Sequence, residues 1–215
     1  MTFDLIALDL DGTALRPDRT NFSIRLQAAL AAAHQKGIAV VPITGRQYGM
    51  LPPAVRTGAT WEKLCVLCNG GEVRTLPGGQ LLEAHYLARG ELLALVELAG
   101  ALDIPVELSA GGVLYLTRES WQVQRRAGDG LRFHLEEILA RRGQETDDLR
   151  ALCSREDLDF DKVTLPWVPE DRRKQLQTAL AALPVAFAWS SGQSVEITHA
   201  QATKEYGMIR VCALL

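Results

Sequence analysis

The alternation of apolar and amphipathic segments in the first 46 residues constrains the fold more than any other feature of the chain. The apolar segment Leu5 to Leu10 is followed by an amphipathic segment, which starts after Ser23 and ends at Gly37, and then by the apolar segment Ile38 to Ile43. This pattern predicts a strand, a helix with Ser23 as its N-cap, and a second strand. Strands joined in this way are parallel, with a right-handed crossover. Both strands should therefore end at the same edge of one sheet.

Polar residues or glycines follow each strand that we predict in this part of the chain. They are Asp9, Asp11 and Gly12 at the end of the first strand, Thr44, Gly45 and Arg46 after the second, and Asn69 after a third strand at Leu64 to Cys68. Ligands of open α/β sheets bind at the carboxyl ends of the strands. This edge of the sheet is therefore the candidate site.

Two carboxylates at the end of one strand indicate chemistry assisted by a metal ion. Asp9 and Asp11 should repel each other unless a cation or a bound proton lies between them. Mg²⁺ prefers carboxylate and carbonyl oxygens, and it can also hold a phosphoryl oxygen. One carboxylate could then act as a nucleophile and the other as a proton donor to the leaving oxygen. Taken alone, the two acids are better explained by an acidic turn, Thr44 to Arg46 by an ordinary turn, and Lys204 by a surface charge.

After about Leu82 the pattern changes to that of an α+β module. We expect helices at 89–101, 131–142 and 169–183, and strands at 104–109, 113–117, 160–165, 185–189 and 194–198. A short or kinked helix at 47–60 and a hairpin of 72–76 with 80–83 complete the first part, and a helix at 202–215 carries Lys204. The predicted fold is α/β, with a Rossmann-like parallel-sheet core of residues 1–82 and 199–215 and an inserted α+β domain of residues 83–198.

Composition argues against several classes of partner. The formal net charge is −3, and no Lys/Arg run is longer than Arg172 to Lys174, so we expect no nucleic-acid partner. There is no basic N-terminal region followed by an apolar signal segment, and no apolar stretch long enough to span a membrane, so we expect no membrane partner and a cytoplasmic location. A small soluble ligand remains the expected partner.

Other residues that could bind a metal ion are better explained by structure. Cys65 and Cys68 have CxxC spacing but lie in an apolar strand, which predicts buried reduced thiols. The four histidines lack metal-ligand spacing. The acids at 156, 157, 159 and 161 and the segment 144–148 are predicted to be solvated loops. Tyr115, Trp121 and Trp189 are predicted to be core residues of the inserted domain rather than ligand contacts.

Taken together, the motifs resemble those of haloacid dehalogenase superfamily phosphatases of the Cof type, which carry a large α/β cap. Asp9 to Leu15 is similar to the first motif of that family, Ile43 to Arg46 to the second, and Lys204 to the third. Asn69-Gly70 resembles the loop on the substrate side, and Val195 to Ile197 the end of the cap. The resemblance covers essentially the whole chain.

This resemblance implies a mechanism and a set of roles. Asp9 would attack phosphorus to form an aspartyl-phosphate, and Asp11 would protonate the leaving alcohol and then activate water. Thr44 and Lys204 would bind the phosphoryl group, and Mg²⁺ would be held at Asp9 and Asp11. The substrate would be a small phosphorylated metabolite, such as a sugar phosphate, bound by Gly12, Gly45, Arg46 and Asn69.

The chain departs from this family pattern after Lys204. In the family, a fourth motif at the end of another core strand supplies metal ligands, and its strand lies beside that of the nucleophile. Here Glu205 is the sole acid after Lys204. We therefore expect weak Mg²⁺ binding through Asp9, the Asp11 carbonyl and water, and impaired turnover. We also expect the edge at residues 5–10 to pair with a second chain or to be covered by a rearranged C-terminus.

Two other classes of function compete with an active phosphatase. The first is a truncated, catalytically inactive relative that keeps a phosphate-binding cleft and serves as a binding or interaction protein. The second is an NAD-binding protein, which is disfavoured because no Gly-x-Gly-x-x-Gly follows the first strand.

Overall fold

The computed structural model describes residues 4–57, 63–126 and 131–215, and the chain divides into two compact units. Unit 1 consists of residues 1–85 and 202–215, and unit 2 of residues 86–201. The division falls a few residues after the expected crossings near 82 and 198. Unit 2 is an insertion, because the chain leaves unit 1 after β5 and returns to it before α8.

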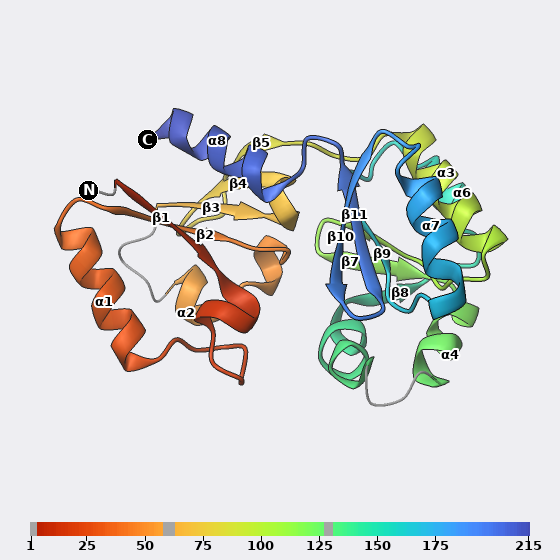
Figure 1. Ribbon diagram of the computed structural model, residues 1–215, viewed down its shortest axis with the longest axis horizontal. Helices are drawn as coiled ribbons and strands as arrows, with labels where there is room; N and C mark the ends of the chain where they lie inside the picture. Colours follow the sequence, from red (N-terminus) through yellow and green to blue (C-terminus); the bar gives the residue numbers. More distant parts are fainter. Residues whose placement is uncertain (1–3, 58–62, 127–130) are drawn as a thin grey trace. The chain divides into compact units, whose positions relative to one another are not determined.

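Unit 1 contains a five-stranded sheet in the order β1-β2-β3-β4-β5 (Figure 1). Its strands are β1 (Leu5–Asp9), β2 (Ala39–Ile43), β3 (Leu64–Leu67), β4 (Glu72–Thr75) and β5 (Leu81–Ala84). The first three strands are parallel, as the sequence predicts, and β4 and β5 join them as an antiparallel hairpin. The prediction of an α/β core is confirmed, and its sheet is mixed.

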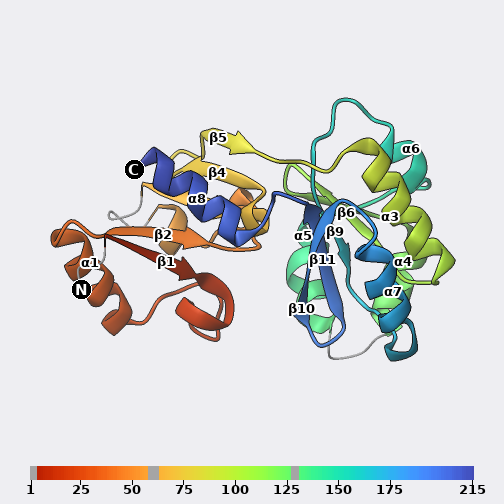
Figure 2. The same ribbon diagram turned by 45° about the horizontal axis from the view of Figure 1, so that its top comes forward.

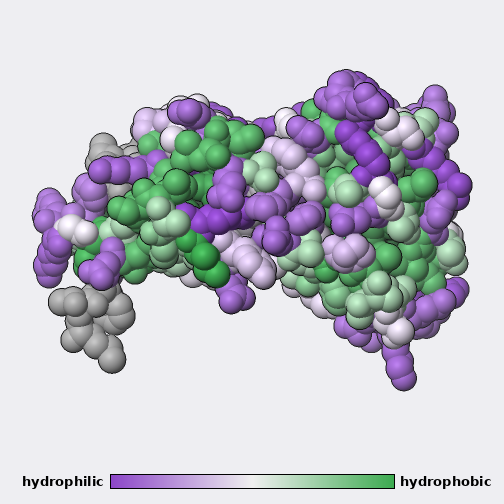
Figure 3. Space-filling model, turned by 90° about the horizontal axis from the view of Figure 1, so that it is seen from above, coloured by the Kyte–Doolittle hydropathy of each residue, from purple (hydrophilic) through white to green (hydrophobic). Residues whose placement is uncertain are grey.

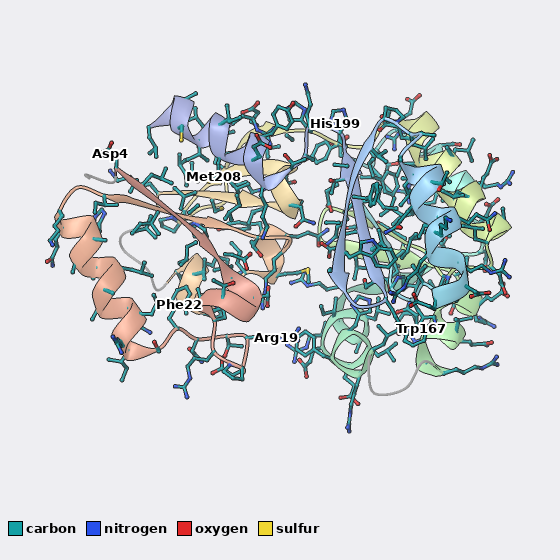
Figure 4. All side chains as sticks on the ribbon, viewed as in Figure 1. Asp4, Arg19, Phe22, Trp167, His199 and Met208 are labelled. Carbon is teal, nitrogen blue, oxygen red and sulfur yellow. The ribbon has the colours of Figure 1, made fainter. Side chains whose placement is uncertain are left out.

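One helix covers each face of this sheet. Helix α1 (Ile24–Gln35) begins at Ser23, whose hydroxyl accepts a hydrogen bond from the Leu26 amide at 3.1 Å, as an N-cap should. It packs on the face that buries Val40 and Leu67. The other face buries Val41, Ile43, Val66 and Val73 against Val211 of α8 (Lys204–Leu214). Met208, labelled in Figure 4, packs with this second cluster. Alternating residues of β2 thus enter two different cores.

Two short helical segments replace the single helix predicted at 47–60. They are η2 (Tyr48–Met50) and α2 (Pro53–Arg56), and the last residues of that range lie outside the described residues. Pro53 occupies the first turn of α2, where its missing amide hydrogen costs nothing. The prolines therefore divide the segment, as expected from their effect on helices.

Unit 2 contains a six-stranded sheet in the order β10-β11-β9-β6-β7-β8 (Figure 2). Its strands are β6 (Glu107–Ala110), β7 (Val113–Leu116), β8 (Gly143–Glu145), β9 (Phe160–Leu165), β10 (Val185–Ser191) and β11 (Ser194–His199). Its helical segments are α3 (Arg89–Ala101), α4 (Arg118–Arg126), η5 (His134–Leu139), α5 (Ala140–Arg142), α6 (Leu149–Cys153), η6 (Glu170–Arg172) and α7 (Arg173–Leu180). The helix predicted at 169–183 is thus shorter than expected, and that at 131–142 is partly π-helical.

Several local predictions for unit 2 were wrong. Helices α4 and α6 were not foreseen, and β8 pairs in parallel with β7 where the sequence suggested a solvated loop. Asp161 is also not in a solvated loop. It lies on β9, is 2% exposed, and accepts a hydrogen bond from the Ser109 hydroxyl at 2.8 Å. Because that hydroxyl satisfies it, a carboxylate is tolerated inside the sheet.

The predictions about cysteines and aromatic residues are confirmed. Cys65 and Cys68 are buried free thiols. Tyr115 and Trp189 pack in or against the main core of unit 2, and Trp121 packs against a smaller cluster around Leu139. In the parts of the chain that the structure describes, no helix combines the length and apolar character needed to cross a membrane.

Candidate functional site

Asp9 is the last residue of β1, and its carboxylate lies at the carboxyl edge of the unit 1 sheet. The turn that follows, η1 (Leu10–Ala14), places Gly12 at a φ of 73°. This left-handed conformation is readily accessible to glycine, which explains the glycine directly after Asp11. The turn also brings the Thr13 hydroxyl back to Asp9, where it donates a hydrogen bond to Oδ2 at 3.0 Å. The turn therefore fixes one oxygen of the candidate nucleophile.

Lys204 reaches the other oxygen of Asp9 from the far end of the chain. Its Nζ lies 2.6 Å from Asp9 Oδ1. Thr203 caps α8 by accepting a hydrogen bond from the Tyr206 amide at 3.2 Å, so Lys204 is the first residue of that helix. The side chains of Lys204 and Asp9 are 46% and 34% exposed, which leaves this ion pair accessible to a ligand.

Asp11 is held by a different cation. The Arg46 guanidinium grips its carboxylate with two hydrogen bonds, from Nε to Oδ2 at 2.7 Å and from Nη2 to Oδ1 at 2.6 Å. Such bidentate pairs are the strongest and most directional ion pairs in proteins. The two acids are thus separated into two ion pairs, which relieves the repulsion that the sequence suggested.

Thr44, Arg46 and Asn69 are linked through the backbone. Thr44 is 1% exposed, and its hydroxyl accepts a hydrogen bond from the Arg46 amide at 3.2 Å. Its carbonyl accepts a hydrogen bond from the Asn69 amide at 3.0 Å. Asn69 has a φ of 57°, a left-handed conformation that Asn adopts more readily than most residues. The loops after β2 and β3 are therefore joined at the same edge of the sheet.

Gly70 has a role that the sequence did not reveal. It has a φ of 109°, and a Cβ at this position would lie 2.0 Å from the Thr203 carbonyl oxygen. Its own carbonyl accepts a hydrogen bond from Arg210 of α8. Gly207 is similarly close, since a Cβ there would lie 2.4 Å from Val66 Cγ1. These close approaches dock α8 on the sheet and so place Lys204. The sequence could have indicated this contact only through an expectation that Asn69-Gly70 packs against a later helix.

The clearest pKa shifts in this unit belong to residues beside the site. Hydrogen bonds from the backbone amides of Thr20 and Asn21 lower the pKa of Asp18 to about 2. Asp18 therefore stays ionised in its loop at any ordinary pH, and that loop contributes the Arg19 carbonyl, which accepts a hydrogen bond from Arg46. Burial lowers the pKa of the Arg210 guanidinium from its usual value, although Glu83 opposes this effect.

The oxygen ligands at this edge fit Mg²⁺. Asp9 and Asp11 offer carboxylate oxygens, and Mg²⁺ is commonly held by one or two carboxylates together with water and a substrate phosphate. In the described residues, no cluster of three or more His, Cys, Asp or Glu side chains is placed to hold a metal ion. Both carboxylates are already paired with cations, so a metal ion would have to compete with Lys204 and Arg46.

Comparison with known proteins places the chain among hydrolases. A sequence profile of haloacid dehalogenase-like hydrolases matches residues 6–215. A curated relative, pyridoxal phosphate phosphatase YbhA of Escherichia coli, is 33% identical over 98 residues. That match covers 46% of this chain and only 35% of the relative.

Solved structures with the same fold cover nearly the whole chain. A haloacid dehalogenase-like hydrolase from B. subtilis matches with a TM-score of 0.77 and 19% identity, over 99% of this chain and 79% of that one. The phosphatase BT1666 from Bacteroides thetaiotaomicron matches with a TM-score of 0.78 and 18% identity, over 99% and 72% of the two chains. At these identities the likeness establishes the fold alone.

Proposed function

Because the chain belongs to the haloacid dehalogenase-like hydrolase family, we propose that it is a Mg²⁺-dependent phosphatase of small phosphorylated metabolites. The observation that carries this proposal is the arrangement of Asp9 between Lys204 and Thr13, beside an Asp11 held by Arg46. It supplies a nucleophile, a cation for the phosphoryl group and a second carboxyl group for proton transfer. The E. coli relative, a pyridoxal phosphate phosphatase, also supports a phosphate monoester as substrate.

The proposed reaction has two steps. A carboxylate oxygen of Asp9 attacks phosphorus, the bond from phosphorus to the leaving oxygen breaks, and Asp11 in its protonated form gives its proton to that oxygen. Asp11 then accepts a proton from the water that attacks the aspartyl-phosphate, which restores Asp9 and releases phosphate. Lys204 and the Thr44 hydroxyl would bind the phosphoryl oxygens, with Gly12, Gly45 and Asn69 lining the substrate side.

Mg²⁺, when bound, would neutralise charge on the transferring phosphoryl group. Asp9 and Asp11 would hold it. Asp9 would supply a carboxylate oxygen and Asp11 its backbone carbonyl, which leaves the Asp11 carboxyl group for proton transfer. With one carboxylate ligand that is already paired with Lys204, we expect weak metal binding and slow turnover.

The same ion pairs favour a second candidate function, that of a phosphate-binding protein without catalysis. Asp9 and Asp11 are each engaged by a cation, and neither carboxylate is free to act until a ligand or metal ion rearranges the site. In this case Lys204 and the surrounding amides would bind a phosphorylated ligand and leave it intact.

The four cysteines are free thiols, which supports a reducing, cytoplasmic location for either function.

Hydrolysis assays distinguish the two functions. We expect the purified chain to release phosphate from p-nitrophenyl phosphate, and from members of a panel of sugar phosphates and pyridoxal phosphate, when Mg²⁺ is added. The rate should fall to background in EDTA. Binding of inorganic phosphate without hydrolysis at saturating Mg²⁺ would select the second function, and absence of both binding and hydrolysis would reject both.

We also propose that the open edge of β1 pairs with a second copy of the chain. Strand β1 pairs with β2 on one side, and no strand pairs with its other side in the described part of the chain. Ala7 at its centre is exposed, and so are Ile209 and Leu214 of α8 and Leu215 after it. Figure 3 shows that hydrophobic residues reach the surface of the molecule in several places. Helix α8 lies over β2, β3 and β4, so it does not supply the missing strand. Two antiparallel β1 strands related by a two-fold axis would satisfy both edges.

This pairing predicts a dimer in light scattering and slow hydrogen exchange at the β1 amides. Ala7→Pro removes an amide hydrogen at the centre of the strand and should shift the dimer towards monomer. Ala7→Val, which keeps that amide, is the control and should remain dimeric. A monomeric wild-type chain whose β1 amides exchange rapidly would contradict the proposed pairing.

A further inference from the structure

Arg46 uses almost all of its hydrogen-bonding capacity inside the protein. Besides its two bonds to Asp11, Nη2 donates to the Arg19 carbonyl at 3.1 Å and Nη1 donates to the Met50 carbonyl at 3.1 Å. A guanidinium has five N–H donors, so four of them are occupied. Its side chain is 16% exposed. The pair of N–H groups, on Nε and Nη2, that could bind a phosphate is therefore already occupied by Asp11.

The Arg46 contacts tie together three separate segments of unit 1. Arg19 lies on the loop after η1, labelled in Figure 4, and Met50 ends η2. Asp11 lies in η1, before both of them in the sequence, and its side chain is 41% exposed. In the part of the chain that the structure describes, the hydrogen bonds to the Asp11 carboxylate both come from Arg46. Without Arg46, an exposed aspartate on a turn would be free to populate several rotamers.

Lys204 differs from Arg46 in each of these respects. Its ammonium group has three N–H donors, and among the described residues it donates to Asp9 alone. Its side chain is 46% exposed, nearly three times the fraction of Arg46. Lys204 can therefore donate to an incoming phosphate without breaking its ion pair, whereas Arg46 cannot offer its fork without releasing Asp11.

From these contacts we infer that Arg46 is a positioning residue, which holds the carboxyl group of Asp11 at the leaving oxygen, and that it is not a phosphate ligand. This role rests on the proposed phosphatase function, since Asp11 needs precise placement only if it transfers a proton. It also replaces the substrate-binding role that the sequence suggested for Arg46. The backbone carbonyls of Arg19 and Met50 hold the guanidinium in place, as a positioning role requires.

Leaving-group dependence tests this role directly. A good leaving group such as p-nitrophenolate needs little protonation, whereas an alkoxide needs a proton from Asp11. Arg46→Gln should therefore lower kcat/KM, which reports the step that expels the leaving group, by about 100-fold for alkyl phosphates and only a few-fold for p-nitrophenyl phosphate. Asp11→Asn should give the same pattern, and adding Arg46→Gln to it should cause no further loss. Arg46→Lys keeps the charge but lacks the fork, so it should restore little of the activity.

Binding of inorganic phosphate in metal-free buffer is the second measurement. Arg46→Gln should leave the Kd for phosphate within a few-fold of wild type, whereas Lys204→Met should weaken it. An equal loss of kcat/KM for all leaving groups, or weakening of phosphate binding to the extent seen in Lys204→Met, would overturn the positioning role.

A wild-type chain that hydrolyses nothing would reject the proposed phosphatase function, and the role of Arg46 would then be decided by two measurements that need no turnover. One is the phosphate affinity of Arg46→Gln. The other is a double-mutant cycle of thermal stability with Arg46→Gln and Asp11→Asn. If the double variant loses less stability than the sum of the two single losses, the two residues interact; additive losses would reject the pairing. Cooperative melting of each variant verifies that it is folded.

Discussion

Replacing Gly70 with alanine is expected to destabilise unit 1 by about 3 kcal/mol and to weaken the candidate site at the same time. The added Cβ would lie 2.0 Å from the Thr203 carbonyl oxygen, and the backbone φ of 109° is itself strained for alanine. Neither problem can be solved by turning a side chain, because the contacting atom belongs to the backbone. Helix α8 must shift away from the sheet, and Lys204 shifts with it.

Thermal unfolding and phosphate binding together test this expectation. The melting temperature should fall by about 6–12 °C, and Gly70→Ala should weaken binding of inorganic phosphate as Lys204→Met does. Gly90→Ala is the matched control, because Gly90 lies in α3 with nothing within 4 Å of an added Cβ. It should be neutral or slightly stabilising. If Gly70→Ala had the same melting temperature as Gly90→Ala, α8 would tolerate the shift and the expectation would be wrong.

The features predicted well from the sequence are those encoded within short segments. The helix after Ser23 has a local cap, β2 and β3 have continuous apolar runs, and α3 occupies exactly the predicted residues Arg89–Ala101. The polar residues at the strand ends also lie at one edge, since parallel strands must end together. Asp9 and Lys204, 195 residues apart, are in contact there.

The features that were missed depend on contacts between distant segments. Helix α4 is mostly polar, and its Gln124 is fully buried. Gln124 Nε2 donates a hydrogen bond to Glu107 of β6 at 2.7 Å, whereas Gln124 Oε1 has no hydrogen-bond partner among the described residues. His134 also lies 2.8 Å from Glu107. Burying a polar side chain is costly unless a partner offsets the loss of water, and the sequence does not show which partner that will be. The same limit applies to Arg46, whose partner Asp11 is 35 residues away.

Asp9→Asn and Lys204→Met should change phosphate binding in opposite directions. The two residues form one ion pair, but an incoming phosphate repels Asp9 and attracts Lys204. In metal-free buffer at low salt, Asp9→Asn should bind inorganic phosphate about 5-fold tighter, because it removes a negative charge and frees the Lys204 ammonium. Lys204→Met should bind phosphate weaker by a similar factor. Both effects should shrink as salt is added, since the pair is partly exposed.

Turnover should respond differently from binding. Asp9→Asn removes the attacking oxygen, so hydrolysis of p-nitrophenyl phosphate should fall by at least about 1,000-fold although phosphate binds more tightly. Lys204→Met should lose both binding and rate, because it removes charge stabilisation of the phosphoryl group. Thr13→Val is the matched control, since it removes the other partner of Asp9 without changing charge, and phosphate affinity should stay near that of wild type. If Asp9→Asn instead weakened phosphate binding and kept its rate, Asp9 would be a ligand-binding residue and the nucleophile would lie elsewhere.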